Sequence, residues 1–158
     1  MASGSHRAGL AVLVLGGAAA LAVAVLHAQQ PAEGPVAVAW DRERCAHCRM
    51  LVSERGFAGQ LHTTAGAVHY FDDPGCLLLW SSSHAEAIRG IWLHHLEQER
   101  WIAADDVVFV SIEPTPMGYG LGARVRGEAQ GLTLEEGRHA VLEHERRRAD
   151  GEFELGTP

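Results

Sequence analysis

The sequence contains no lysine and no asparagine, and all 13 of its permanently basic side chains are arginines. The absence of lysine excludes Schiff-base chemistry and a P-loop phosphate site, because both need a lysine amine. Acidic residues outnumber basic ones, 20 against 13, which gives a formal net charge of −7. This balance leaves no basic surface for phosphate neutralisation, so we expect no nucleic-acid partner.

Signatures of catalysis are also missing from the 158 residues. No Ser/His/Asp order and no glycine-rich phosphate cradle stands out. The adjacent acids Asp72 and Asp73 are explained more simply as a helix cap and a dipole partner than as paired catalytic carboxylates. We therefore expect that the protein is not an enzyme.

One long apolar run is present, over residues 8–26. Its length fits both a membrane-spanning helix and a long signal-peptide core, and the small residues 22–24 offer a cleavage site. Arg7 precedes the run and acidic residues follow it, which favours export of the remainder. No cysteine lies near the end of the run, which excludes lipid attachment there. We predict a signal peptide or membrane anchor over residues 1–28 and a periplasmic or outer-face location for the rest.

A linker and one domain follow this segment. Residues 29–37 are polar and rich in proline and glycine, which is typical of a linker. The domain is predicted over residues 38–158. Its first clear element is a β-hairpin, because β-forming residues at 57–63 and 67–72 flank a short turn.

Two helices are marked by their capping residues. Asp73 is a natural N-cap and Pro74 suits the first helical position. Thr133 and Glu136 form a capping box that opens a second helix through about Arg148. Further strands are predicted over residues 36–40, 91–96, 107–112, 124–129 and 152–155, with a loop over 114–122.

The order of strands, helix and strand therefore occurs twice. We predict an α+β fold of two small related strand–strand–helix–strand units that share a core, with halves at 38–97 and 98–158.

The richest chemical motif is CAHCRM at residues 45–50, in a chain with three cysteines and three methionines. Three interpretations are open from the cysteines alone. A zinc site needs four ligands, and only one CxxC pair is present. A disulfide can join any two of Cys45, Cys48 and Cys76, which leaves one thiol unpaired. A thioredoxin-like dithiol would need a long helix after the motif, where the sequence instead predicts a hairpin.

A fourth interpretation uses the methionines. Cys48 and Met50 lie two residues apart, so an extended segment places both side chains on one side. Thiolate and thioether are soft ligands that select Cu(I). The other methionine after the initiator, Met117, stands between proline and glycine in a predicted loop, where a core-filling role is less expected.

These features resemble the NosL family, the copper-binding accessory proteins of nitrous oxide reductase. The resemblance covers roughly residues 45–122. It rests on CRM at 48–50, FAGQL at 57–61, YFDDPGC at 70–76, WIAA at 101–104 and TPMGYG at 115–120, in this order. It implies an exported, membrane-associated Cu(I) carrier that delivers copper to an apo-copper enzyme or to its membrane assembly machinery.

The resemblance also implies a set of metal ligands. Cys48 and Met50 match the first two, and Met117 is implied as the third, from the other half of the domain. Cys45 matches the variant of the motif with two cysteines and is implied as a ligand or a resolving thiol. His47 is an adjacent donor.

The chain departs from the family pattern in two places. Members are usually lipoproteins, and this chain has no lipid-bearing cysteine. The residue between Cys48 and Met50 is often glycine, and here it is Arg49. Cys76, beside a predicted helix start, is expected to be a small packed residue. The rival function is a membrane-tethered thiol–disulfide oxidoreductase that uses Cys45 and Cys48.

Overall fold

The sheet of this protein is built around the predicted hairpin. A computed structural model describes Leu21 and residues 33–84 and 86–151. The chain divides into the units Met1–Glu33 and Gly34–Pro158, and the fold described here is that of the second. Apart from Leu21, the predicted signal peptide or anchor lies outside the described residues, as does the predicted strand at 152–155. No helix within the described part is long and apolar enough to cross a membrane.

The hairpin consists of β1 (Gly59–Thr63) and β2 (Val68–Phe71), which pair antiparallel. Gly66 allows the turn between them because its φ of 90° is one that side-chain-bearing residues avoid. Two further strands, β3 (Ile88–His94) and β4 (Trp101–Ala103), complete an antiparallel sheet in the order β2-β1-β3-β4. The predicted hairpin is confirmed, and the predicted strand at 91–96 begins three residues earlier, at Ile88.

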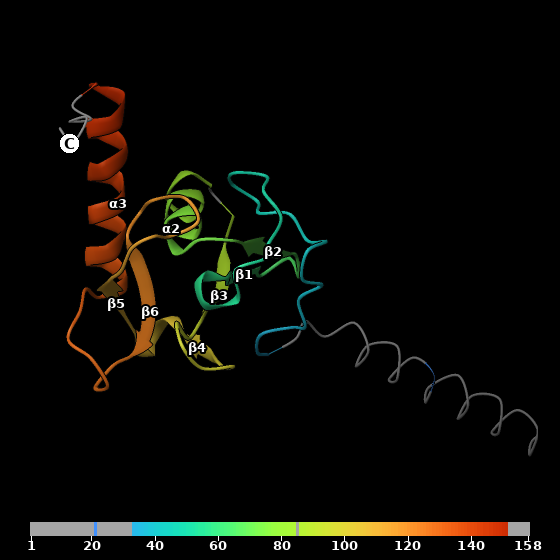
Figure 1. The fold of residues 1–158 in the computed structure, drawn as a ribbon. Helices are drawn as coiled ribbons and strands as arrows, with labels where there is room; N and C mark the ends of the chain where they lie inside the picture. The colour runs from blue at the N-terminus through green and yellow to red at the C-terminus, as the bar shows by residue number, and fades with distance from the viewer. Residues whose placement is uncertain (1–20, 22–32, 85, 152–158) are drawn as a thin grey trace, which may run out of the picture. The chain divides into compact units, whose positions relative to one another are not determined.

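Helix α2 (Pro74–Ser83) begins where the sequence predicts. The Asp73 carboxylate accepts a hydrogen bond from the Gly75 N–H at 2.7 Å, and proline occupies the start of the helix. Every residue from Pro74 to Trp80 is buried. Because α2 packs on β1 and β2 on one side and on the second helix on another, it lies at the centre of the fold (Figure 1).

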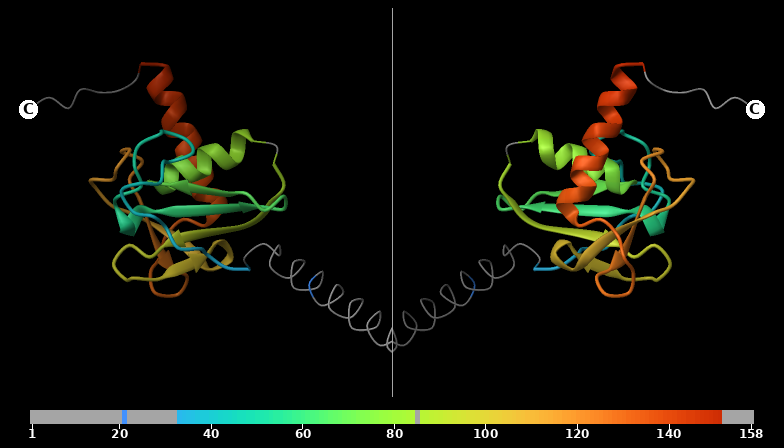
Figure 2. Two further views of the ribbon diagram at one scale, coloured as in Figure 1. Left: turned by 90° about the vertical axis from the view of Figure 1, so that its right-hand side faces the viewer. Right: turned by 90° about the vertical axis from the view of Figure 1, so that its left-hand side faces the viewer.

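A second, two-stranded sheet contains β5 (Val107–Ser111) and β6 (Leu121–Val125), and helix α3 (Leu134–Ala149) follows it. The predicted Thr133 capping box is formed by hydrogen bonds in both directions with Glu136. Figure 2 shows α3 crossing beside α2 on one side of the strands. Short 3₁₀ helices cover Arg55–Phe57 and Ala104–Asp106. The fold is therefore α+β, with two antiparallel sheets and two helices in the described part.

Two predictions about strands are wrong, and one strand was not predicted. Residues 36–40 form no strand, because the Gln60 side chain, fully buried, pairs with both the N–H and the C=O of Val36 and replaces a strand partner. The return strand predicted at 124–129 lies earlier in the chain, because β6 pairs with β5 over Leu121–Val125 and the chain turns at Gly127, whose φ is 93°. Strand β4 was not expected at all; it pairs with β3 from Trp92 to His94.

Candidate metal centre

The CAHCRM motif forms a tight loop, called here the cysteine loop (residues 45–50). The Cys45 N–H donates to the Met50 carbonyl at 2.8 Å, and the Arg49 N–H donates to the Cys45 carbonyl at 3.1 Å. The Ala46 N–H donates to the Tyr70 carbonyl on β2 at 2.8 Å, which fixes the loop to the edge of the sheet. The loop is therefore closed on itself and attached to the strand that leads into α2.

Three sulfur atoms come together at this point. The Sγ atoms of Cys45, Cys48 and Cys76 all lie within 4.8 Å of one another. Cys45 and Cys48 come from the cysteine loop, and Cys76 comes from the first turn of α2. Cys45 and Cys76 are fully buried, whereas Cys48 is partly exposed, so the group opens to solvent on one side. All three are free thiols.

The surroundings of Cys45 favour its thiolate. The hydrogen bond that the Cys76 thiol donates to Cys45 has the largest effect on the pKa of Cys45 and lowers it. Burial raises this pKa, but the net change is a lowering. Backbone N–H groups of Asp72, Cys48 and His47 lower it further. The pKa of Cys76 is raised, because its proton is held by Cys45 and its side chain is buried. Burial also raises the pKa of Cys48. One thiolate and two thiols is therefore the favoured state of the group without metal.

Two of the ligands implied by the resemblance lie beside this group without being buried in it. The Met50 side chain, at the end of the cysteine loop, is 49% exposed. His47 is exposed as well. Both side chains are therefore accessible to solvent.

Met117 lies in the loop between β5 and β6, called here the Met117 loop (residues 112–120). Its backbone N–H donates to Asp73 Oδ2 at 3.1 Å, which attaches this loop to the start of α2. The Met117 side chain is half-buried and packs against the core that contains Cys45 and Cys76. The two halves of the chain thus meet at the turn of α2 that carries Cys76.

Cys76 is the residue that sequence reasoning missed. It was expected to be a small packed residue, and it is fully buried in the core, yet its sulfur also belongs to the three-sulfur group. One signal pointed to it: the CxxC pair leaves an odd third cysteine. Residue 76 is too far along the chain for sequence spacing to place it near residues 45 and 48. The hydrogen bond between the cysteine loop and β2 brings the two segments together.

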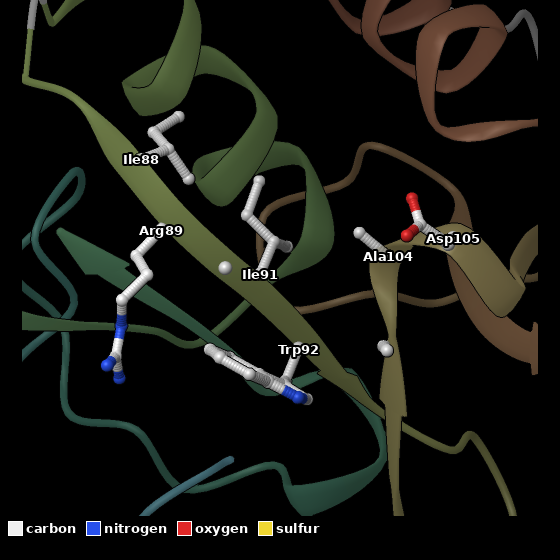
Figure 3. A pocket seen from close by; sticks show the side chains of 8 residues that line it. Ile88, Arg89, Ile91, Trp92, Ala104 and Asp105 are labelled. Carbon is white, nitrogen blue, oxygen red and sulfur yellow. The ribbon is translucent and has the colours of Figure 1, made fainter. Parts of the chain in front are cut away.

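Several grooves in the described part lie away from the three sulfurs. One, of about 330 Å³, is lined by Ile88, Arg89, Gly90, Ile91, Trp92, Ala103, Ala104 and Asp105, and it shares no residue with the sulfur group (Figure 3). In the sheet register, Ile88 pairs with Thr63 at one end of β1, while Gly59 at the other end pairs with Phe71 and Leu93.

Fold and site together define a domain with a three-cysteine group whose geometry is compatible with metal binding. Among the described residues it is the one set of three or more cysteine, histidine or acidic side chains arranged in this way. Three cysteines fall short of the four ligands that a structural zinc site uses. No family model, curated protein or solved structure matches the chain.

Arg49 gives a first prediction about the cysteine loop. Its φ of 69° lies in the left-handed region that favours glycine. We expect Arg49→Gly to raise the unfolding free energy by about 1 kcal/mol, measured by denaturant unfolding of the reduced protein. Asp41→Gly is the matched control: Asp41 has a φ of 61°, but aspartate tolerates this region better, so its gain should be smaller. Equal gains at both positions, or a loss at Arg49, would contradict the strain inferred here.

Proposed function

We propose that this protein is an exported, membrane-associated Cu(I)-binding accessory protein of the NosL type. It would deliver copper to an apo-copper enzyme, such as nitrous oxide reductase, or to the membrane machinery that assembles it. The observation that carries the proposal is the set of three cysteine sulfurs within 4.8 Å of one another, open to solvent on one side. The two-unit architecture implied by the resemblance is part of the same proposal.

The choice of copper rests on the donor set. Thiolates and thioethers are the soft ligands that select Cu(I) over magnesium or calcium. Cu(I) accepts two or three such ligands, so three cysteines suffice, whereas a structural zinc site uses four. Two methionines can complete the set: Met50 at the end of the cysteine loop, and Met117, which packs against the core that contains Cys45 and Cys76.

Metal transfer is the role that suits this arrangement. Cys48 is partly exposed and Met50 is 49% exposed, so a donor from another protein has access on that side. Cys45 and Cys76 are fully buried and keep the other side closed. Ligand exchange at the open side needs no acid–base chemistry, so we propose a carrier without enzymatic activity.

The double variant Met50→Ala/Met117→Ala tests the ligand set. We expect it to weaken Cu(I) binding about tenfold or more in competition with a chromophoric Cu(I) chelator, because it removes both thioethers. The single substitution Leu51→Ala, at an exposed apolar residue of the same segment, serves as the control and should leave the affinity unchanged. Equal affinity for the wild type and the double variant would remove the methionines from the site.

A thiol–disulfide oxidoreductase is the second candidate, favoured by the stabilised Cys45 thiolate in a CxxC pair. The full burial of Cys45 speaks against it, because an attacking thiolate needs access to its substrate. Protein purified from an oxidising compartment separates the two. A metal carrier keeps three free thiols by mass measurement after alkylation, whereas a dithiol oxidant carries a disulfide that reductant opens.

A further inference from the structure

Asp73 does more than cap α2. It is fully buried, and its two carboxylate oxygens have different partners. Oδ1 accepts the Gly75 N–H at 2.7 Å, within the helix turn that carries Cys76. Oδ2 accepts the Met117 N–H at 3.1 Å, and the Thr115 hydroxyl also donates to this carboxylate. One buried side chain therefore joins the Met117 loop to the first turn of α2.

Asp72 has a parallel role on the other side. It is 2% exposed, and its Oδ1 accepts the Ser53 N–H at 2.8 Å, while the Glu54 N–H donates to the same carboxylate. The Asp72 N–H in turn donates to the Cys45 sulfur. Asp72 therefore joins the segment that leaves the cysteine loop to the same point of the chain.

Both attached segments line one groove of about 330 Å³, Glu54 and Phe57 from one segment and Pro114, Thr115 and Pro116 from the other. The pair of aspartates at the start of α2 is the structure that both have in common.

From these contacts we infer that Asp73 is the positioning residue for Met117 and that Asp72 is the positioning residue for the cysteine loop. The inference rests on the proposed function, because it assigns to the two carboxylates the placement of donors for Cu(I). Each aspartate acts through a backbone N–H and contacts no metal. Both the Met117 loop and the cysteine loop are thereby held in place relative to the helix turn that carries Cys76.

The matched variants Asp73→Ser and Asp72→Ser test this assignment. Serine is as good an N-cap as aspartate, so Asp73→Ser keeps an acceptor for the Gly75 N–H. Serine has one side-chain oxygen on a shorter side chain, so it cannot accept from the Gly75 N–H and also from the Met117 N–H. Methyl-¹³C methionine labelling gives separate NMR signals for Met50 and Met117, which Met50→Leu and Met117→Leu assign. In the reduced protein without metal, Asp73→Ser should move the Met117 signal and leave that of Met50, and Asp72→Ser should do the reverse.

A copper titration adds the functional result. Asp73→Ser should lower the Cu(I) affinity about tenfold, the usual effect of changing a residue that orients a ligand. In the wild type, adding Cu(I) should shift the Met117 methyl signal. In Asp73→Ser the same addition should leave that signal unshifted. If both variants moved the same signal, or neither moved any, the assignment would be overturned. If the wild type bound no Cu(I), the proposed function would fail, while the crossed NMR pattern of the metal-free protein would still decide this inference.

Discussion

Replacing Cys76 by alanine should abolish tight Cu(I) binding. Cys76 contributes one of the three sulfurs that lie within 4.8 Å of one another, and its thiol also donates a hydrogen bond to Cys45. Changes to residues that only orient a ligand cost about 10–100-fold in metal affinity, so loss of a ligand should cost about 100-fold or more. Competition with a chromophoric Cu(I) chelator, at equal concentrations of reduced wild type and variant, measures this ratio.

The control for Cys76→Ala is a variant that removes side-chain atoms from the same core and keeps all three cysteines. Val141 is 1% exposed and belongs to the same hydrophobic core, so Val141→Ala should cost stability while keeping Cu(I) affinity. Unfolding of the metal-free proteins shows whether the two variants are comparably destabilised. If Cys76→Ala bound Cu(I) as tightly as the wild type, Cys76 would be only the packed residue that its burial first suggests.

Gly75→Ala should destabilise the fold, even though alanine favours a helix more than glycine does. A Cβ at residue 75 would lie 2.2 Å from Cδ2 and 2.3 Å from Cγ of the Tyr119 ring. The gain in helix propensity is about 1 kcal/mol, whereas overpacking of this kind costs about 1–3 kcal/mol. We expect a net loss of up to about 2 kcal/mol in unfolding free energy, measured with denaturant.

A second effect of Gly75→Ala should appear at the metal site. Tyr119 lies two residues after Met117, and its hydroxyl donates to Glu145 on α3 at 3.1 Å. Displacing the ring moves the Met117 loop, so Cu(I) affinity should fall along with stability. Gly34→Ala is the control, because nothing lies within 4 Å of a Cβ at residue 34. Unchanged stability of Gly75→Ala would mean that Tyr119 does not hold this loop against α2.

The parts of the fold that sequence reasoning predicted are those with local causes. Asp73 and Pro74 mark the start of α2, and Thr133 with Glu136 marks that of α3, because caps satisfy N–H groups a few residues away. The hairpin of β1 and β2 is likewise a short-range feature, since its turn joins neighbouring strands.

The parts that it missed depend on distant residues. Residues 36–40 have the composition of a strand, but their partner is the side chain of Gln60 rather than another strand. Strand β4 exists because β3 offers it an edge. Such pairings follow from the assembled sheet and leave no signal in local composition.

The candidate site divides in the same way. The closeness of Cys45 and Cys48 follows from their spacing, and the sequence alone indicated a soft-metal or thiol site there. The inclusion of Cys76 depends on the hydrogen bonds that attach the cysteine loop to β2. The third sulfur joins the group only through tertiary structure, so the position of Cys76 beside a predicted helix start indicated no more than a small packed residue.

X-ray absorption at the copper edge, on reduced protein loaded with Cu(I), tests the central claim most directly. It reports which elements surround the metal and how many neighbours each contributes. If the sulfurs of Cys45, Cys48 and Cys76 hold the metal, the spectrum will show a ligand shell of sulfur, at least three atoms in number. A shell dominated by nitrogen or oxygen, or an identical spectrum from Cys76→Ala, would contradict a three-cysteine copper site.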